Sequence, residues 1–426
     1  MKQVEHLRQI MRYCHWTEKM EFINLAAMLI MIPINSGVSL LFACCWMLSV
    51  VLKNTLLKRW SFFTWHQDKN YQGGRERYLL IPMMCYWFIY LLSMLWTANV
   101  EEGWIELGRS AWFLLFPLTC VCTDFRQFNR QCVQLMMWLF VLLMSLLFVM
   151  LLAIVVIKAC ASSEHSFLWF MMNEEFYYIH HSYMALYLLS GLVFLYTECD
   201  KSLKDNILHY LKCAACALCL ILFLLCINSR AGLLCLLVLL VLCWIHQCFI
   251  RKKYRYAIGA LAAVLLLVVA AHFALPSHFR RLSETVEQVA QGDKSDGRFK
   301  IMGNAWSVVK DNMLLGVGAG DRMDELVPYY GSMEDTYCPH NQFLDTWMTT
   351  GLLGLLALLA MLIIPWVMAW RKRLLFPFLF VILLGLSLMF ESMLERQMGV
   401  VFVALMYVFI VMIFDVESPD NKYIKL

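Results

Sequence analysis

Residues 132–157 read CVQLMMWLFVLLMSLLFVMLLAIVVI, and no Asp, Glu, Lys or Arg interrupts them. A helix that rises about 1.5 Å per residue needs about 20 such residues to cross the roughly 30 Å hydrocarbon core of a bilayer. This segment therefore predicts a transmembrane helix, and further apolar segments lie before and after it. We expect spans at 20–35, 38–53, 78–97, 109–123, 132–157, 183–197, 207–228, 232–250, 257–275, 343–369, 375–390 and 399–415.

The composition of the whole chain agrees with many spans. Hydrophobic residues make up 62% and charged residues 15% of the sequence, against roughly 45–50% and 25% in soluble domains. One aqueous core cannot bury that much apolar surface, so lipid must be the main solvent of the protein. The composition excludes a soluble globular protein and predicts an all-α, polytopic membrane protein with about twelve transmembrane helices. We expect membrane lipids around it and no nucleic-acid partner.

Basic residues indicate how the chain is oriented. With twelve spans and both termini on one side, every strongly basic connection falls on that side, which the positive-inside rule makes cytoplasmic. In a bacterial inner membrane we expect nine spans in residues 1–275, a long periplasmic loop at 276–342, and three spans with a cytoplasmic tail in 343–426. Cys160 and Cys338 also fall on the periplasmic side, and whether they pair stays open. The basic residues are Lys53, Lys58, Arg59, Lys69, Arg75, Arg77, Arg126, Arg130, Lys201, Lys204, Arg251, Lys252, Lys253, Arg255, Arg371, Lys372 and Arg373.

The segment 276–342 is too polar to span and too long for a simple connection, and long ordered loops are usually functional. Apolar residues recur at helical spacing over 279–289, which predicts an amphipathic helix on the membrane surface. Residues 292–297 have the composition of a flexible turn. A second helix is expected from about Gly297 to Lys310, and one of its faces carries Ile301, Ala305 and Val308.

Three outward-facing motifs carry residues suited to chemistry. The first is Ser-Arg-Ala-Gly at 229–232, between two strongly apolar spans. The second is Asp-Gly-Arg at 296–298, followed by Leu-Leu-Gly-Val-Gly-Ala-Gly at 314–320. The third is Pro-His-Asn-Gln-Phe-Leu at 339–344, followed by Gly-Leu-Leu-Gly at 351–354. The glycine-rich stretch has no preceding strand and no following Lys-Ser or Lys-Thr, so we expect a tight bend and not a phosphate-binding loop.

In this order the motifs resemble the O-antigen ligase and O-antigen polymerase superfamily, over roughly residues 175 to 415. Its members have an arginine after the span that precedes the last long loop, a Gly-Arg in that loop, a glycine-rich turn, and a His-Asn-x-x-Leu motif before a Gly-x-x-Gly span. His-His-Ser-Tyr at 180–183 and Glu-Ser-Met-Leu-Glu-Arg at 391–396 also look like family positions. The chain departs from the family at Asn312-Met313, where a proline is common, and this bears on the local turn and not on the chemistry.

The resemblance implies a GT-C-like membrane enzyme that transfers a glycan from undecaprenyl diphosphate without a metal or another cofactor. It implies that Arg230 and Arg298 contact the diphosphate and that His340 assists attack by the acceptor hydroxyl. Asn341 and His181 are the further candidates for substrate contact. Arginine is always charged and binds phosphate oxygens in a bidentate fork. Histidine, with an unperturbed pKa of about 6.5, is suited to accept a proton near neutral pH.

Each of these residues also has a purely structural explanation. Arg230 could snorkel to the interface at a helix end, and Arg298 could be a solvated helix residue. His340-Asn341 could simply be the start of the next helix, with Asn341 as its N-cap. The charged residues of 391–396 could form ion pairs at helix ends.

The acceptor is expected to be a sugar of a lipid A-core, as in lipopolysaccharide biosynthesis by a ligase. A polymerase that joins lipid-linked repeat units and a protein O-oligosaccharyltransferase are alternatives with the same donor. A transporter for the lipid-linked glycan is a fourth interpretation. It is less favoured, because the two halves of the chain show no internal repeat and the candidate arginines lie at helix ends or in the loop.

Overall fold

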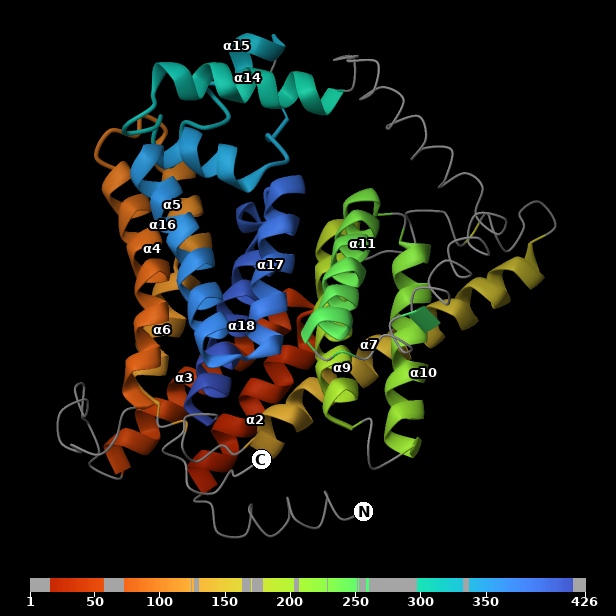
Figure 1. Ribbon diagram of the computed structural model, residues 1–426. Helices are drawn as coiled ribbons and strands as arrows, with labels where there is room; N and C mark the ends of the chain where they lie inside the picture. The colour runs from red at the N-terminus through yellow and green to blue at the C-terminus, as the bar shows by residue number, and fades with distance from the viewer. Residues whose placement is uncertain are drawn as a thin grey trace.

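The computed structural model describes residues 16–56, 73–123, 125, 130–162, 170, 179–202, 207–227, 229–250, 252, 258–259, 297–331 and 337–416. Within these ranges every regular element is a helix, as the sequence predicts (Figure 1). The elements are α2 (Trp16–Met31), α3 (Ser36–Leu56), η2 (Gly73–Leu80), α4 (Ile81–Ser93), α5 (Val100–Ser110), α6 (Trp112–Cys122), α7 (Arg130–Ala161), α9 (His181–Ser202), α10 (Ile207–Cys226), α11 (Arg230–Ile245), η5 (His246–Ile250), α14 (Gly297–Asp311), α15 (Val327–Tyr330), α16 (Gln342–Lys372), α17 (Leu375–Phe390), η6 (Met393–Glu395) and α18 (Gln397–Val416).

Among the described residues, eight helical stretches are long and apolar enough to cross a membrane, so the chain is a multi-pass membrane protein. Each coincides with a predicted span, and two shorter apolar helices, Arg77–Ser93 and Leu375–Phe390, coincide with two more. α2 lies at the predicted span 20–35, and the predicted span 257–275 lies outside the described residues. The total of about twelve spans and the GT-C-like fold stay predictions. The eight stretches are Ser36–Leu56, Val100–Cys122, Gln131–Ala161, His181–Cys199, Ile207–Cys226, Arg230–Ile250, Gln342–Lys372 and Gln397–Asp415.

The span predicted at 109–123 begins earlier in the structure. α5 starts after Asn99, whose side chain accepts a hydrogen bond from the backbone N–H of Glu102 at 3.2 Å. The first turn of α5 contains the acidic residues Glu101 and Glu102. Their negative charges stabilise the helix because they lie near the positive end of its dipole. Ala111 alone separates α5 from α6, so the two form one apolar stretch with a polar, capped beginning. Hydrophobicity alone does not detect such a beginning.

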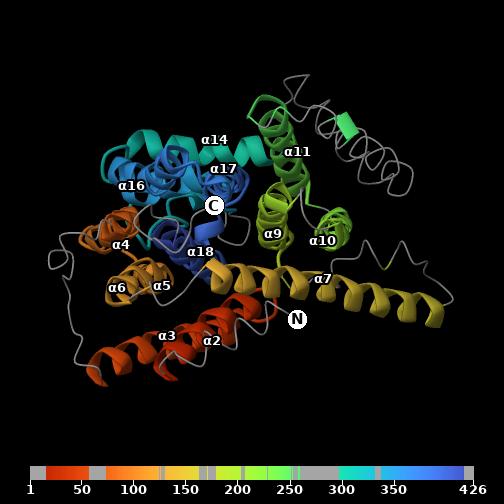
Figure 2. The ribbon, with the colours of Figure 1, turned by 60° about the horizontal axis from the view of Figure 1, so that its bottom comes forward.

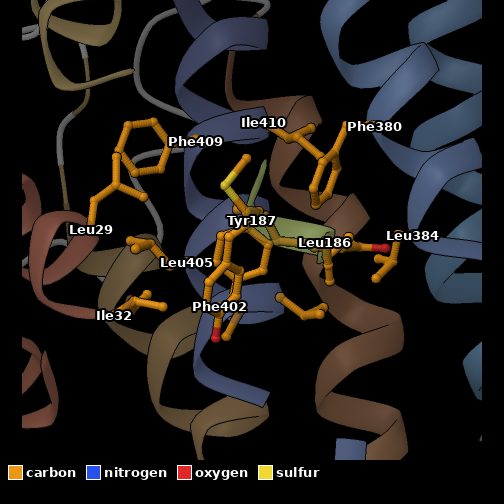
Figure 3. Close-up of a cluster of buried hydrophobic side chains, with 14 of the residues drawn as sticks. Leu29, Ile32, Leu186, Tyr187, Phe380, Leu384, Phe402, Leu405, Phe409 and Ile410 are labelled. Atoms are coloured by element: carbon orange, nitrogen blue, oxygen red, sulfur yellow. The ribbon is translucent and has the colours of Figure 1, made fainter. Parts of the chain in front are cut away.

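α9 and α18 form the interior of the bundle. In their apolar windows 89% and 83% of the residues are buried, whereas the other candidate spans bury 17–44%. Figure 2 shows α18 among α6, α7, α9 and α17. At this contact Phe402 of α18 packs on Tyr187 of α9, with ring centroids 4.4 Å apart, and on Phe380 of α17 (Figure 3). Aromatic pairs of this kind fix the helices at a defined separation.

α14 and α15 lie across the end of the bundle at which α16 begins (Figure 1). α14 spans Gly297–Asp311, so the helix predicted there is confirmed. Its residues Ala305 and Val308, which belong to the predicted apolar face, are buried in a small cluster. The cluster also contains Leu326, from the loop after α14, and Met348 of α16. This cluster anchors α14 to the membrane domain. The predicted amphipathic helix over 279–289 and the turn before α14 lie outside the described residues.

α16 is broken at Gly351, where the backbone has φ 68° and ψ −162°. The break leaves main-chain groups without partners in the helix, and the loop after α14 supplies them. Leu352 donates its N–H to the carbonyl of Met313 at 3.1 Å, and Val317 donates to the carbonyl of Met348 at 2.9 Å. Non-helical backbone inside a membrane span is tolerated where the protein satisfies it in this way.

Close approach between the loop and the break requires glycine on both sides. Gly316 and Gly318 have φ 71° and 112°, which confirms the tight bend predicted for the glycine-rich stretch. A Cβ on Gly316 would lie 2.5 Å from the backbone nitrogen of Gly351. A Cβ on Gly351 would meet the carbonyl of Leu314. The loop and the first part of α16 are therefore held together through their main chains.

Candidate active site

His340 stands directly before α16, at the end of the bundle that α14 crosses. Its backbone is left-handed, with φ 49°, a conformation in which histidine is enriched among non-glycine residues. Asn341 follows as the N-cap of α16, and its side-chain oxygen accepts from the backbone N–H of Leu344 at 3.0 Å. Asn341 thus has the structural role that the sequence offers as the alternative to substrate contact. The cap and the left-handed turn together fix the position of His340 relative to the helix.

The His340 side chain forms a hydrogen-bonded pair with a carboxylate from another element. Its Nδ1 lies 2.8 Å from Oε1 of Glu391, the residue that ends α17. The second oxygen of Glu391 accepts from the hydroxyl of Ser182, in the first turn of α9, at 3.1 Å. The Glu391 side chain is 11% exposed and that of His340 31%. Three segments that are far apart in the sequence thus meet around a partly accessible imidazole.

The charge of Glu391 determines what His340 can do. Burial alone would raise the pKa of Glu391, but the hydrogen bond and charge of His340, the charge of His180 and the Ser182 hydroxyl together lower it. Glu391 is therefore a carboxylate near neutral pH and can only accept hydrogen bonds. Nδ1 of a neutral His340 must then carry the proton, which leaves Nε2 with a free lone pair.

His180 and His181 lie beside this pair. Their rings stack with centroids 4.1 Å apart. Burial, and then the charge of His181, lower the pKa of His180 to about 4, while Glu391 acts in the opposite direction and Arg396 and His340 act in the same one. His180 is therefore neutral at pH 7. The predicted substrate residue His181 thus stands at the start of α9, next to Ser182 and close to the His340–Glu391 pair.

A second group of charges, three buried and two partly buried, lies next to the pair, and we call it the Arg322 cluster: Glu106, Arg322 and Asp345 are buried, and Arg109 and Glu395 partly so. Nη1 of Arg322 lies 3.1 and 3.0 Å from the two carboxylate oxygens of Asp345. Nη2 lies 2.8 Å from Glu395 and 3.4 Å from Glu106. Arg109 pairs with Glu106 at 2.5 Å. The ion pairing expected within 391–396 is thus confirmed for Glu395.

Sequence reasoning missed most of this cluster. Glu106, Arg322 and Asp345 are buried charged residues at the ends of apolar spans or in the connecting loop. Buried ionisable groups in such places are costly unless they are paired, and they mark functional sites by default. Asp345, which follows the His-Asn motif at the head of an apolar segment, was the signal available in the sequence.

The structure places Arg230 and the backbone of Arg298 at the same end of the molecule. α9 begins beside Glu391, and α10 returns alongside α9, so α11 begins on the face from which α9 starts. Arg230 is the first residue of α11, with an exposed side chain, and the preceding Ser229 caps the helix by accepting from Gly232 at 3.1 Å. Arg298 lies in the first turn of α14, which crosses this end (Figure 1), and its side chain is outside the described part.

The cysteines and possible metal ligands add two observations. Cys160 and Cys338 are both free, so the disulfide left open by the sequence is not formed. The Cys338 thiol instead donates to Glu395 at 2.7 Å. Within the described ranges, no three His, Cys, Asp or Glu side chains gather as a metal ion would require.

Residues 215–359 match a family model described as O-antigen ligase. The matched stretch contains Arg230, Arg298 and His340 and ends within α16, whereas Glu391 and the two neighbouring histidines lie outside it. No curated protein matches the chain.

Proposed function

We propose, since residues 215–359 match a family model described as O-antigen ligase, that the chain is a membrane glycosyltransferase that acts on lipid-linked glycans. The proposed donor is a glycan on undecaprenyl diphosphate, and the proposed acceptor is a hydroxyl of a lipid A-core sugar. The reaction would form a glycosidic bond to the acceptor oxygen and break the bond between the sugar and the diphosphate. Ligation, and not the joining of repeat units, is the form of the reaction that we propose.

The observation that carries the proposal is the pair formed by His340 and Glu391, with Ser182 on the second carboxylate oxygen. In the proposed mechanism Nε2 of His340 takes the proton of the acceptor hydroxyl as its oxygen attacks the anomeric carbon. The imidazole becomes an imidazolium, and Glu391 stabilises the new charge through Nδ1–H. The pair thus has the arrangement of a general base held in one tautomer by a carboxylate.

The leaving diphosphate keeps the electron pair of the broken bond, so negative charge increases there. Arg230 and Arg298 are the proposed partners of this charge, because guanidinium groups bind phosphate oxygens without losing their proton. His181 and Asn341 are the remaining proposed substrate contacts. Because the side-chain oxygen of Asn341 caps α16, its amide nitrogen is the atom that we propose for substrate.

We further propose that this end of the molecule faces the periplasm of a bacterial inner membrane and that both termini are cytoplasmic. The support is the basic group Arg371–Arg373 at the opposite end of α16, some 45 Å from His340 for a helix of this length. In this topology residues 1–275 and 343–426 form the membrane domain and 276–342 the periplasmic loop.

Reconstitution of purified protein in vesicles tests the proposal. The vesicles contain an undecaprenyl-diphosphate-linked glycan and lipid A-core, with no ATP and no ion gradient, and the products are separated by size. We expect glycan joined to lipid A-core by the wild type and no product with His340→Ala. Longer glycan on the lipid carrier would identify a polymerase, and glycan on a protein acceptor would identify a protein O-oligosaccharyltransferase. Donor movement across the bilayer without a new covalent bond would identify a transporter.

A deletion strain separates the first two of these in cells. Loss of a ligase leaves unmodified core, with polymer retained on the lipid carrier. Loss of a polymerase leaves core that carries a single repeat unit. The first pattern is the one we expect.

A further inference from the structure

Arg322 has a buried guanidinium group that the proposed chemistry does not use. The residue is 7% exposed and lies in the loop between α14 and α16. One of its terminal nitrogens donates hydrogen bonds to both carboxylate oxygens of Asp345, and the other donates to Glu395 at 2.8 Å. A single side chain therefore joins the first turn of α16 to the turn between α17 and α18.

These are the two segments that carry the proposed base and its carboxylate. Asp345 follows His340 along the start of α16, and Glu395 follows Glu391 along the turn 391–396. The segments are thus joined twice, directly by His340 and Glu391 and again through Arg322. On the basis of the proposed function, we propose that Arg322 is a positioning residue that sets the contact between His340 and Glu391.

Other contacts support the same junction without supplying a charge to it. The backbone N–H of Leu394 donates to the side-chain oxygen of Gln342 at 2.6 Å. The hydroxyl of Tyr183, in α9, donates to the carbonyl of Met393 at 3.2 Å. Since these bonds also hold the turn, loss of the fork of Arg322 should displace the turn without unfolding it.

Arginine is suited to this position for a geometric reason. Its planar fork can engage two carboxylates in different directions at once, whereas the ammonium of lysine is a point charge on a flexible stem. Removal of the cation altogether would leave the buried Asp345 and the partly buried Glu395 uncompensated, which is strongly destabilising. Arg322→Lys is therefore the informative substitution, because it keeps the charge and removes the fork.

The charges around both contacts stay in place in that variant. His180, His181 and Arg396 face Glu391 and His340 from α9 and from the turn. Glu106 faces Arg322 from α5, and Arg109 on the same helix pairs with Glu106. A change in the pH profile of Arg322→Lys therefore reports on the distance between His340 and Glu391 and not on the loss of a charged neighbour.

We expect Arg322→Lys to lower kcat in the vesicle assay by about 10- to 100-fold, the usual effect of displacing a reacting group by about 1 Å. The KM for the lipid-linked donor should stay within about twofold, because the proposed donor residues are not touched. The acid limb of the kcat/KM profile should move to lower pH, because a displaced Glu391 stabilises the imidazolium less. The matched control is Asp321→Asn on the same loop, whose carboxylate accepts from the N–H groups of Ala98 and Asn99 at 2.8 and 2.6 Å. It should keep the wild-type pH profile.

A double variant makes the test decisive. If Arg322 acts through Glu391, then Arg322→Lys should lower kcat little further in a Glu391→Gln background. Multiplicative effects, or a kcat of Arg322→Lys within about threefold of wild type, would overturn the inference and leave the proposed function intact. An active His340→Ala variant would instead overturn the proposed function. If Arg322→Lys does not accumulate, Glu395→Gln, which removes the other charge of the bridge, should show the same coupling to Glu391→Gln.

Discussion

At the residue scale, the site places charge where the protein itself can balance it. The hydrogen bonds of His340 and Ser182 favour the carboxylate form of Glu391. Arg322 forms ion pairs with Asp345 and Glu395 in the layer next to it. An imidazole supported in this way can gain a proton without a large rearrangement, because its partner charge is already in place.

Arg298→Ala should reduce transfer in the vesicle assay below detection, while the protein still inserts at wild-type levels. The reason is the loss of a charged partner for the leaving diphosphate. Arg298→Lys should retain a small part of the activity, since it keeps the charge and loses the fork. The control is Lys300→Ala, an exposed cation in the same turn of α14, which should stay near wild type. Near-normal transfer by Arg298→Ala at normal expression would refute the assigned role.

The pKa of His180 predicts a pH dependence of stability. It lies at about 4 in the folded protein, against 6.5 ordinarily. Between these values the unfolded chain binds more protons at this residue, so stability falls as the pH drops from 6.5 to 4. The lowered pKa of Glu391 affects stability at lower pH. Its contribution to stability is fully present above pH 4.5 and is lost only as the pH falls through the lowered pKa of the folded protein. We expect His180→Gln to lose less Tm than wild type between pH 7 and pH 5, as measured by thermal unfolding in detergent. Parallel curves would contradict this.

At the element scale, the break in α16 should be intolerant of a side chain. Gly351→Ala would bring a Cβ against the Leu314 carbonyl at φ 68°, so we expect a loss of about 1–3 kcal/mol in the free energy of unfolding. Gly303→Ala is the matched control in α14, where a Cβ would meet nothing within 4 Å. It should gain about 0.5–1 kcal/mol from helix propensity. Equal Tm values for the two variants would rule out this account of the break.

The elements differ in how far the sequence could predict them. The apolar length of α7 is a local property, and its span was predicted for that reason. The start of α5 depends on the Asn99 cap, which hydrophobicity does not register. The break at Gly351 depends on a loop that returns from α14, so no local pattern could indicate it. The same holds for the site: the His340 motif was visible in the sequence, but the partners of Arg322 lie on elements that only the fold brings together.

At the scale of the whole molecule, the proposed topology can be tested with reporter fusions in cells. A fusion of green fluorescent protein after Arg373, between α16 and α17, should fluoresce, and alkaline phosphatase fused there should be inactive, because the basic end of α16 is proposed to be cytoplasmic. Fusions after Gly331, which follows α15, should show the reverse. Any other combination of reporter activities would contradict the proposed orientation.

The contact between the glycine-rich loop and α16 limits how homologous sequences can diverge. It consists of bonds between main-chain atoms, including those from Leu352 to Met313 and from Val317 to Met348. Exchange of the side chains at these non-glycine positions leaves such bonds in place, whereas adding or deleting one residue would shift every donor past its acceptor. Selection should therefore conserve the length of this segment more strictly than the identity of its amino acids. An unusual residue such as Asn312 can be accommodated there.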